Sequence, residues 1–154
     1  MPGFRSPFHD THPFWVLVEI EGFAAAELDA ILEEAAAEGF VAEALFAASQ
    51  VQRVAFRRLR EALPDANGRA SWIVAHDVCV PIALIPDYLA QLRSALLRVA
   101  PGCRESVFGH LGDGNLHVTI LPPREVSVSA ELWLPESLSE AVLGPALALG
   151  VGQR

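Results

Sequence analysis

The stretch that decides the fold is a glycine-rich turn between two predicted strands, and it reads Phe108-Gly109-His110-Leu111-Gly112-Asp113-Gly114-Asn115-Leu116-His117. Residues 104–109 and 115–121 have strand composition. In the second of these segments, Leu116, Val118 and Ile120 alternate with His117 and Thr119, so that the two sets face opposite sides of a sheet. Gly112 and Gly114 permit positive φ, and Asp113 and Asn115 can bond to the turn's own amides. The sequence therefore predicts two strands joined by a tight turn.

The rest of the chain alternates between strand and helix patterns. Further strands are predicted at residues 14–20, 40–46 and 71–80, and helices at about 24–38, 49–63 and 86–101. The second helix opens with the capping-box pair Ser49 and Gln52, and Pro64 is expected to end it. This order predicts an α+β fold, a ferredoxin-like sandwich in which a small, mostly antiparallel sheet carries helices on one face.

Residues 13–121 are predicted to form one domain, whereas residues 122–154 form a divergent tail with weak periodicity. Pro135 and Pro145 limit any helix there, so we expect the tail to be loosely held. The alternative is that its apolar residues pack on the uncovered sheet face. Those residues are Leu132, Trp133, Leu134, Leu138, Val142 and Leu143.

Composition excludes several classes of partner. The 154 residues carry a net charge of −8 and no basic patch, which argues against binding to nucleic acid or anionic lipid. No apolar run is long enough to cross a bilayer, and no secretory leader opens the chain. Cys79 and Cys103 are expected to stay reduced in a cytoplasmic protein.

The residues with the clearest chemical potential are His110 and His117, which flank the turn. Two imidazoles on one side of a turn, with a carboxylate, would suit a divalent metal ion. The alternative for an arbitrary pair at this spacing is a hairpin with two half-exposed histidines. Asp77 either braces this site or bonds to nearby backbone, and we favour the backbone role. His76 is expected on the surface, on the face opposite to Asp77.

Three motifs in order resemble the C-terminal domain of FAD-linked oxidases, a family that includes D-lactate and D-2-hydroxyglutarate dehydrogenases. They are Arg58-Leu59-Arg60-Glu61, then His76-Asp77-Val78-Cys79-Val80-Pro81 followed by Ile85-Pro86, and then the histidine string. The resemblance covers roughly residues 13–121. It implies that a separate domain binds FAD, that the substrate is a small 2-hydroxy acid, and that this part caps the flavin.

The resemblance also implies roles for individual residues. His110 and His117 would be catalytic and would bind a divalent metal, zinc or manganese. Arg60 would pair with the substrate carboxylate, although the stripe of Arg53, Arg57 and Arg60 is by itself more typical of a solvated helix face. The turn residues Gly112, Asp113, Gly114 and Asn115 would be structural.

The chain departs from the family at several points. Ala75 stands where many relatives have a lysine, and Arg57 where an aromatic residue is common. Ser129-Ala130-Glu131 echoes a later metal-binding motif, but Leu132 replaces its histidine. We therefore expect weak metal binding and no activity without a flavin domain.

Two other functions stay open. One is a non-catalytic interaction or oligomerisation module, whose partner is a second copy or a separate FAD-binding domain. In that case the chain would be either a gene remnant or one subunit of a split flavoenzyme. The other, less favoured, is a metal hydrolase using Asp113 or Glu131.

Overall fold

The computed structural model describes residues 6–22, 25–123 and 135–150. Its elements, in chain order, are α1 (Ala25–Ala37), α2 (Gln50–Asn67), β1 (Val74–Cys79), η1 (Ile82–Leu84), α3 (Ile85–Val99), β2 (Arg104–His110), η2 (Leu111–Asp113), β3 (Asn115–Leu121) and α4 (Pro135–Ala148). The chain divides into two compact units, Met1–Leu63 and Pro64–Arg154, which are described separately below.

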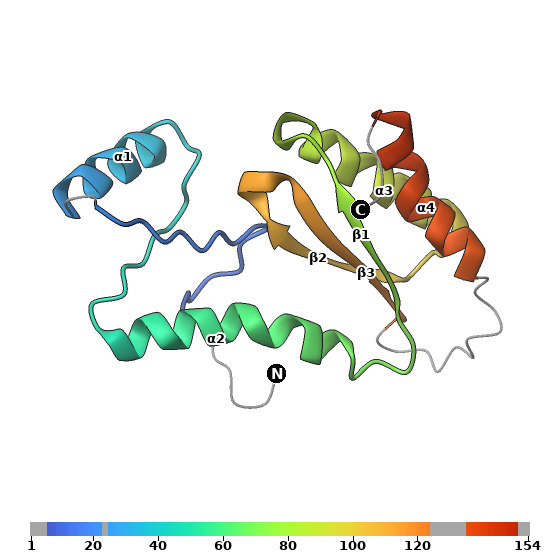
Figure 1. Cartoon of the computed structure of the whole chain (residues 1–154), viewed down its shortest axis with the longest axis horizontal. Coiled ribbons are helices and arrows are strands. Elements are labelled where there is room, and N and C mark those ends of the chain that lie inside the picture. Colours follow the sequence, from blue (N-terminus) through green and yellow to red (C-terminus); the bar gives the residue numbers. More distant parts are fainter. Residues whose placement is uncertain (1–5, 23–24, 124–134, 151–154) are drawn as a thin grey trace. The chain divides into compact units, whose positions relative to one another are not determined.

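The second unit is built on a three-stranded antiparallel sheet with the order β1-β3-β2 (Figure 1). The central strand β3 pairs on one side with β1 and on the other with β2, so that His117 lies opposite both Asp77 and Phe108. The strand pair β2–β3 and the tight turn between them are therefore as predicted.

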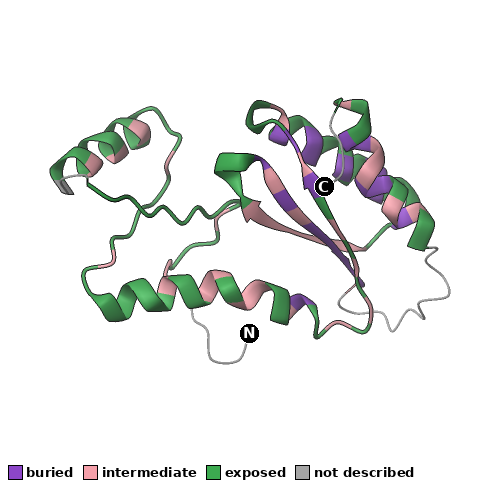
Figure 2. Ribbon diagram, viewed as in Figure 1, coloured by how far each residue is buried: buried purple, intermediate pink, exposed green. Residues whose placement is uncertain are grey.

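Helices α3 and α4 pack against one face of this sheet, and the core lies between them. From β3 the core receives Leu116, Val118 and Ile120, each no more than 7% exposed. Helix α3 contributes an apolar stripe that includes the fully buried Leu92. Figure 2 shows the same division, with buried residues gathered on β3, α3 and α4.

The described part of the tail, residues 135–148, forms helix α4. Leu138, Ala141, Val142 and Ala146 of this helix are buried in the core, on the helix-covered face of the sheet rather than the open one. Pro145 lies inside the helix, one turn before its end. Residues 124–134, which include Leu132, Trp133 and Leu134, lie outside the described residues.

The first unit differs from the prediction in its strands. Residues 14–20 and 40–46 are not strands, and most of their large apolar side chains are exposed, with Phe14 at 63% and Phe40 at 80%. The predictions of strands there are wrong. Their composition suits a strand, but a strand is stable only beside a partner. Residues 6–22 and 25–63, the described part of this unit, contain no strand that could pair with them.

Helix α2 begins as predicted and ends later than predicted. The Ser49 hydroxyl accepts a hydrogen bond from the Gln52 amide (3.3 Å), and the Gln52 side chain accepts one from the Ala48 amide (2.7 Å). The helix does not end at Pro64 but continues to Asn67. Proline has no backbone N–H, so the helix lacks one backbone hydrogen bond at position 64. Asn67 is buried, and its side-chain amide donates to Ser106 on β2.

The predicted fold class is confirmed: the structure is α+β, with a small antiparallel sheet and helices packed on it. Among the described residues, no helix is both long and apolar enough to cross a membrane.

Tyr88 should make the second unit sensitive to alkali. It is the chain's only tyrosine, it is fully buried on α3, and its hydroxyl donates to the Val142 carbonyl at 3.2 Å. Burial raises the pKa of this phenol far above its usual range. Because the folded pKa exceeds the unfolded value of about 10, stability should fall as pH rises above about 10.

This alkaline loss is measurable by urea unfolding at increasing pH, with tyrosinate absorption followed in parallel. Phenol ionisation should coincide with unfolding. Tyr88→Phe should cost about 1 kcal/mol at neutral pH and remove the contribution of residue 88 to the alkaline slope. Tyrosinate formation in a chain that remains folded would contradict the burial of Tyr88.

The contribution of α4 to stability can be measured with two leucines of the same helix. Leu138→Ala should destabilise the chain by about 2–5 kcal/mol, because Leu138 is 2% exposed in the core. Leu147→Ala is the matched control, since Leu147 is 63% exposed, and it should cost less than about 0.5 kcal/mol. Equal, small effects in urea unfolding would favour the loosely held tail.

Candidate functional site

A cluster of polar and aromatic side chains occupies the sheet face opposite α3 and α4. Strand alternation places His117 of β3 on this face, with Asp77 of β1 on one side and Phe108 of β2 on the other. His110, at the end of β2, shares the face because it pairs with Asn115 of β3. All three strands therefore contribute side chains to one site, which we call the open-face site.

His117 is held by a hydrogen bond to Asp77. Its ring nitrogen Nδ1 lies 2.5 Å from Asp77 Oδ1. A carboxylate accepts hydrogen bonds only, so His117 donates from Nδ1 and, when neutral, keeps its lone pair on Nε2. The sequence favoured a backbone role for Asp77, whereas the structure shows it bracing His117.

His110 and Phe108 complete the surroundings of His117. The ring centroids of His110 and His117 are 6.5 Å apart, and those of Phe108 and His117 are 5.1 Å apart. His110 is exposed, whereas the His117 side chain is 33% exposed. The two histidines that the sequence singled out are therefore brought together on one side of the turn.

The turn itself is fixed by close backbone contacts. Gly114 has φ of 68° and ends η2, and its carbonyl accepts a hydrogen bond of 2.9 Å from the Val80 amide. A Cβ on Gly114 would lie 2.1 Å from the Val80 carbonyl oxygen. Only glycine meets both demands, so the turn is anchored to the end of β1.

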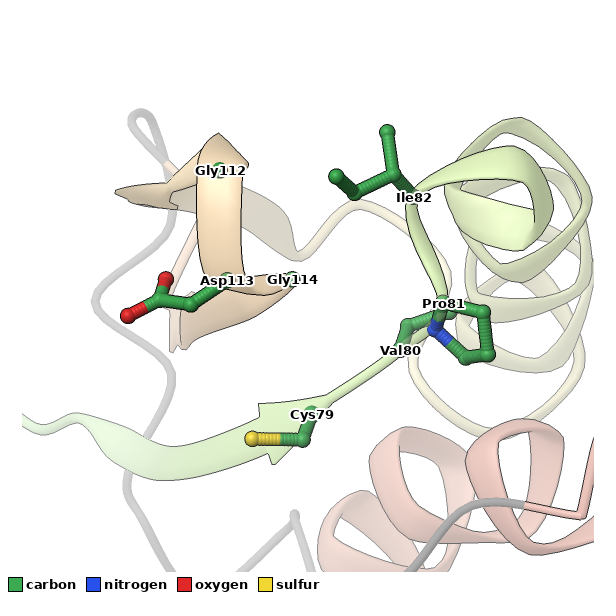
Figure 3. Close-up of a pocket in the computed structure, with 7 residues that line it drawn as sticks. All are labelled: Cys79, Val80, Pro81, Ile82, Gly112, Asp113 and Gly114. Carbon is green, nitrogen blue, oxygen red and sulfur yellow. The ribbon is translucent and has the colours of Figure 1, made fainter.

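A shallow, mostly apolar depression of about 360 Å³ lies beside this anchor (Figure 3). The turn residues Gly112, Asp113 and Gly114 form one wall, and the segment from Cys79 to Ile82 forms the other. Neither histidine lines it, so the depression is adjacent to the open-face site and not part of it.

The described residues do not complete a metal site. Two imidazoles are present, but Asp77 is already bonded to Nδ1 of His117, and no group of three or more His, Cys, Asp or Glu side chains is arranged for a metal ion in the described residues. Glu131, the further carboxylate that the sequence offered, lies outside the described residues. Metal binding by His110 and His117 stays a prediction, and no step below depends on it.

The arginine stripe lies on α2, in the first unit. Arg57 forms an ion pair with Glu19, with Nε 2.6 Å from Oε1, and this bond lowers the pKa of Glu19. Both side chains are more than half exposed, as expected for a solvated helix face. Arg60 is partly buried on the same helix, whereas His110 and His117 belong to the second unit.

His76 was expected on the surface, but it is partly buried. It faces the opposite side from Asp77, as predicted, and its Nε2 is hydrogen-bonded to the Ser139 hydroxyl of α4 at 2.9 Å. The prediction failed because the packing of α4 over β1 could not be derived from the weak pattern of the tail. His76 therefore fastens α4 to the sheet and takes no part in the open-face site.

Asn115 is the residue whose position the sequence did not explain. It was given a structural role in the turn, but its Oδ1 is buried and has no hydrogen-bond partner among the described residues. The sequence did contain a feature that predicts the position of Asn115. It lies two residues before His117 in the same strand, so both side chains are on the same face of the sheet.

Comparison with known proteins shows which family and which proteins this chain resembles. The family described as FAD linked oxidases, C-terminal domain, matches residues 1–142. The chain is 34% identical over 128 residues to D-2-hydroxyglutarate dehydrogenase of Xanthomonas citri pv. viticola, which covers 81% of the chain and 27% of that protein. It is 33% identical over 113 residues to the mitochondrial D-2-hydroxyglutarate dehydrogenase of Rattus norvegicus, covering 70% of the chain and 21% of that protein.

A putative mitochondrial D-lactate dehydrogenase of Schizosaccharomyces pombe is 28% identical over 154 residues, which cover 89% of the chain and 29% of that protein. The chain thus spans between 20% and 29% of the length of such relatives.

The turn offers a matched pair of glycine substitutions. Gly114→Ala should destabilise the chain by more than about 1–2 kcal/mol, because it adds a contact with Val80 to the strain of positive φ. Gly112→Ala is the control, since its Cβ would meet nothing within 4 Å and its φ is not positive. Urea unfolding measures both, and equal effects would show that the Gly114 anchor is unimportant.

Proposed function

The chain belongs to the family of FAD-linked oxidase C-terminal domains, and on that premise we propose that it is the substrate-facing part of an FAD-dependent dehydrogenase for a small 2-hydroxy acid. Of the three relatives described above, two are named for D-2-hydroxyglutarate and one for D-lactate, which are both 2-hydroxy acids. The proposal places the flavin on polypeptide outside these 154 residues, because the relatives are several times longer than the segment matched.

The observation that carries the proposal is the bond between Asp77 and His117. Oxidation of a 2-hydroxy acid removes a hydride from the α-carbon and a proton from the hydroxyl group. With Nδ1 donating to Asp77 at 2.5 Å, Nε2 is the nitrogen of His117 that is left to act as a base. This is the arrangement in which a carboxylate fixes the imidazole tautomer and stabilises the imidazolium that forms.

In this proposal, bound FAD supplies the hydride acceptor. His117 takes the hydroxyl proton at Nε2, and the charge that develops on its ring is balanced by Asp77. Phe108, whose ring centroid is 5.1 Å from that of His117, places an apolar ring beside the base.

Two further residues are assigned to the substrate. Arg60 would bind the carboxylate, because a planar guanidinium offers two parallel donors to its two oxygens. His110 would contact the substrate from the opposite end of the turn, through the ring that faces His117. Zinc or manganese binding by the two histidines stays a prediction and is an alternative to the proton transfer, because a metal ion would use the same Nε2 lone pair of His117. A cytoplasmic location also stays a prediction.

The interaction module remains the second candidate, and one observation favours it. Within residues 14–20, all six large apolar side chains are at least 43% exposed: Phe14, Trp15, Val16, Leu17, Val18 and Ile20. Such a surface is typical of a segment that binds another polypeptide. If the partner is a polypeptide that carries the flavin, the chain is both an interaction module and part of a dehydrogenase. If the partner is a second copy of this chain, it is an interaction module only.

The proposal predicts that the chain alone is colourless and inactive, and that it works inside a flavoenzyme. We would exchange it for the matching quarter of the Xanthomonas citri pv. viticola relative and measure dye reduction with D-2-hydroxyglutarate and D-lactate. His117→Ala in the chimera should lower kcat/KM by about 10²–10⁴-fold, the typical contribution of a general base. The flavin content, read from its absorbance, should not change.

His9→Ala is the control, because His9 is an exposed histidine of the first unit, and it should leave the rate unchanged. The proposal fails if a flavin-loaded chimera reduces no dye with any 2-hydroxy acid, or if His117→Ala is as active as its parent. Flavin absorbance in the purified 154-residue chain would contradict the placement of FAD on other polypeptide.

A further inference from the structure

The depression beside the turn meets the open-face site at Cys79. This residue lines the depression, and it lies two residues after Asp77 on β1. Both side chains are on the same face of the sheet, because Val78 between them is buried in the core on the other face. Two residues along a strand cover about 6.6 Å. The mouth of the depression is therefore one row of side chains away from the pair of Asp77 and His117.

The two walls of the depression are fixed before any ligand binds. One wall is the turn that ends at Gly114, and the other is the end of β1 together with Pro81 and Ile82. The Val80 amide donates to the Gly114 carbonyl at 2.9 Å, which holds the walls at one separation. The volume of about 360 Å³ is at the small end of the range for ligand pockets, which is about 300–1,000 Å³.

The walls offer apolar surface and no positive charge. The seven residues that line the depression, all of them described, include one charged side chain, the Asp113 carboxylate, and no arginine, lysine or histidine. In the view of Figure 3 this carboxylate points away from Pro81 and Ile82, whose side of the depression is apolar. An anion placed there would lie near Asp113 without a cation to balance it, whereas an alkyl group would cover apolar surface.

A 2-hydroxy acid has one part for which the proposed function names no binding surface. Its hydroxyl group is assigned to His117 and its carboxylate to Arg60, which leaves the substituent on the α-carbon. This substituent is a methyl group in D-lactate, whereas in D-2-hydroxyglutarate it ends in a second carboxylate. The depression lies one row of side chains from His117, within the reach of a substituent of a few carbons.

We propose that the depression is the subsite for this substituent and that it selects an uncharged alkyl group. The inference rests on the proposed function for the position of the reacting end of the substrate, and it adds the substrate class, a 2-hydroxy acid with one carboxylate and a short alkyl chain. D-2-hydroxyglutarate is disfavoured, because its second carboxylate would lie near Asp113 in a depression without a cation.

The first test compares two acids of equal length that differ only at the far end of the substituent. D-2-hydroxypentanoate ends in a methyl group where D-2-hydroxyglutarate ends in a carboxylate. Each acid is titrated into the full 154-residue chain labelled with ¹⁵N, and NMR follows the amide signals of Gly112 and Gly114, which line the depression. D-2-hydroxypentanoate should shift these signals saturably, with a dissociation constant in the millimolar range, and D-2-hydroxyglutarate should bind about tenfold more weakly.

Two aliphatic residues provide a matched pair of variants for this titration. Ile82 and Leu111 are each 50% exposed and belong to the short turns η1 and η2, but only Ile82 lines the depression. Ile82→Ser removes apolar surface from the subsite and should weaken binding of D-2-hydroxypentanoate about fivefold. Leu111→Ser should leave the binding unchanged.

The second test measures turnover in the chimera described above. The value of kcat/KM should rise about twofold for each methylene added between D-lactate and D-2-hydroxypentanoate; full burial would give about fourfold, but the depression is shallow. Asp113→Lys should raise kcat/KM for D-2-hydroxyglutarate relative to D-2-hydroxypentanoate by about tenfold. Asp113→Asn, which removes the charge and keeps the shape, should raise the same ratio by about threefold.

The inference is overturned if the Gly112 and Gly114 amides respond equally to both acids or to neither, or if Ile82→Ser and Leu111→Ser weaken binding equally. An active chimera that prefers D-2-hydroxyglutarate to D-2-hydroxypentanoate would also overturn it and would leave the proposed function intact. Because the titration needs neither flavin nor turnover, an inactive chimera would count against the proposed function alone.

Discussion

Strand β3 is hydrogen-bonded to β1 along one edge and to β2 along the other. Both the core and the open-face site of the second unit depend on this pairing. Because its neighbours fix its register, alternate side chains must meet two different surroundings. Leu116, Val118 and Ile120 meet α3 and α4 and form the core, whereas Asn115 and His117 meet side chains of β1 and β2 on the open face. A slip of one residue would exchange the two sets and destroy core and site together.

The sequence predicted this central part well because its information is local. The alternation in residues 115–121 and the glycines of the turn are enough to place His110 and His117 on one side. The strands at residues 14–20 and 40–46 were wrong for the opposite reason. Their composition is that of a buried strand, but strand formation depends on a partner, and no property of the segment itself specifies one.

The contacts that the sequence could not give are those between elements distant in the chain. Asp77 and His117 are 40 residues apart, and His76 and Ser139 are 63 apart. Alternation correctly put His76 and Asp77 on opposite faces, but the identity of their partners required the register of β1 against β3 and the packing of α4. The weak pattern of the tail concealed that its residues 135–148 complete the core.

The two faces of β3 have different roles: the residues on one face stabilise the fold, and those on the other form the open-face site. Of the side chains proposed to act on a substrate, His110 and His117 lie on the sheet face that α3 and α4 leave uncovered, so they can change with little effect on the core. The glycines of the turn differ, because Gly109 and Gly114 serve both purposes: they bring three strands together and thereby set the positions of Asn115, His110 and His117. A site assembled from cross-strand neighbours takes its precision from backbone hydrogen bonds that exist before any ligand arrives. The proposed function requires this property, because a base can take a proton from a substrate only from a fixed position.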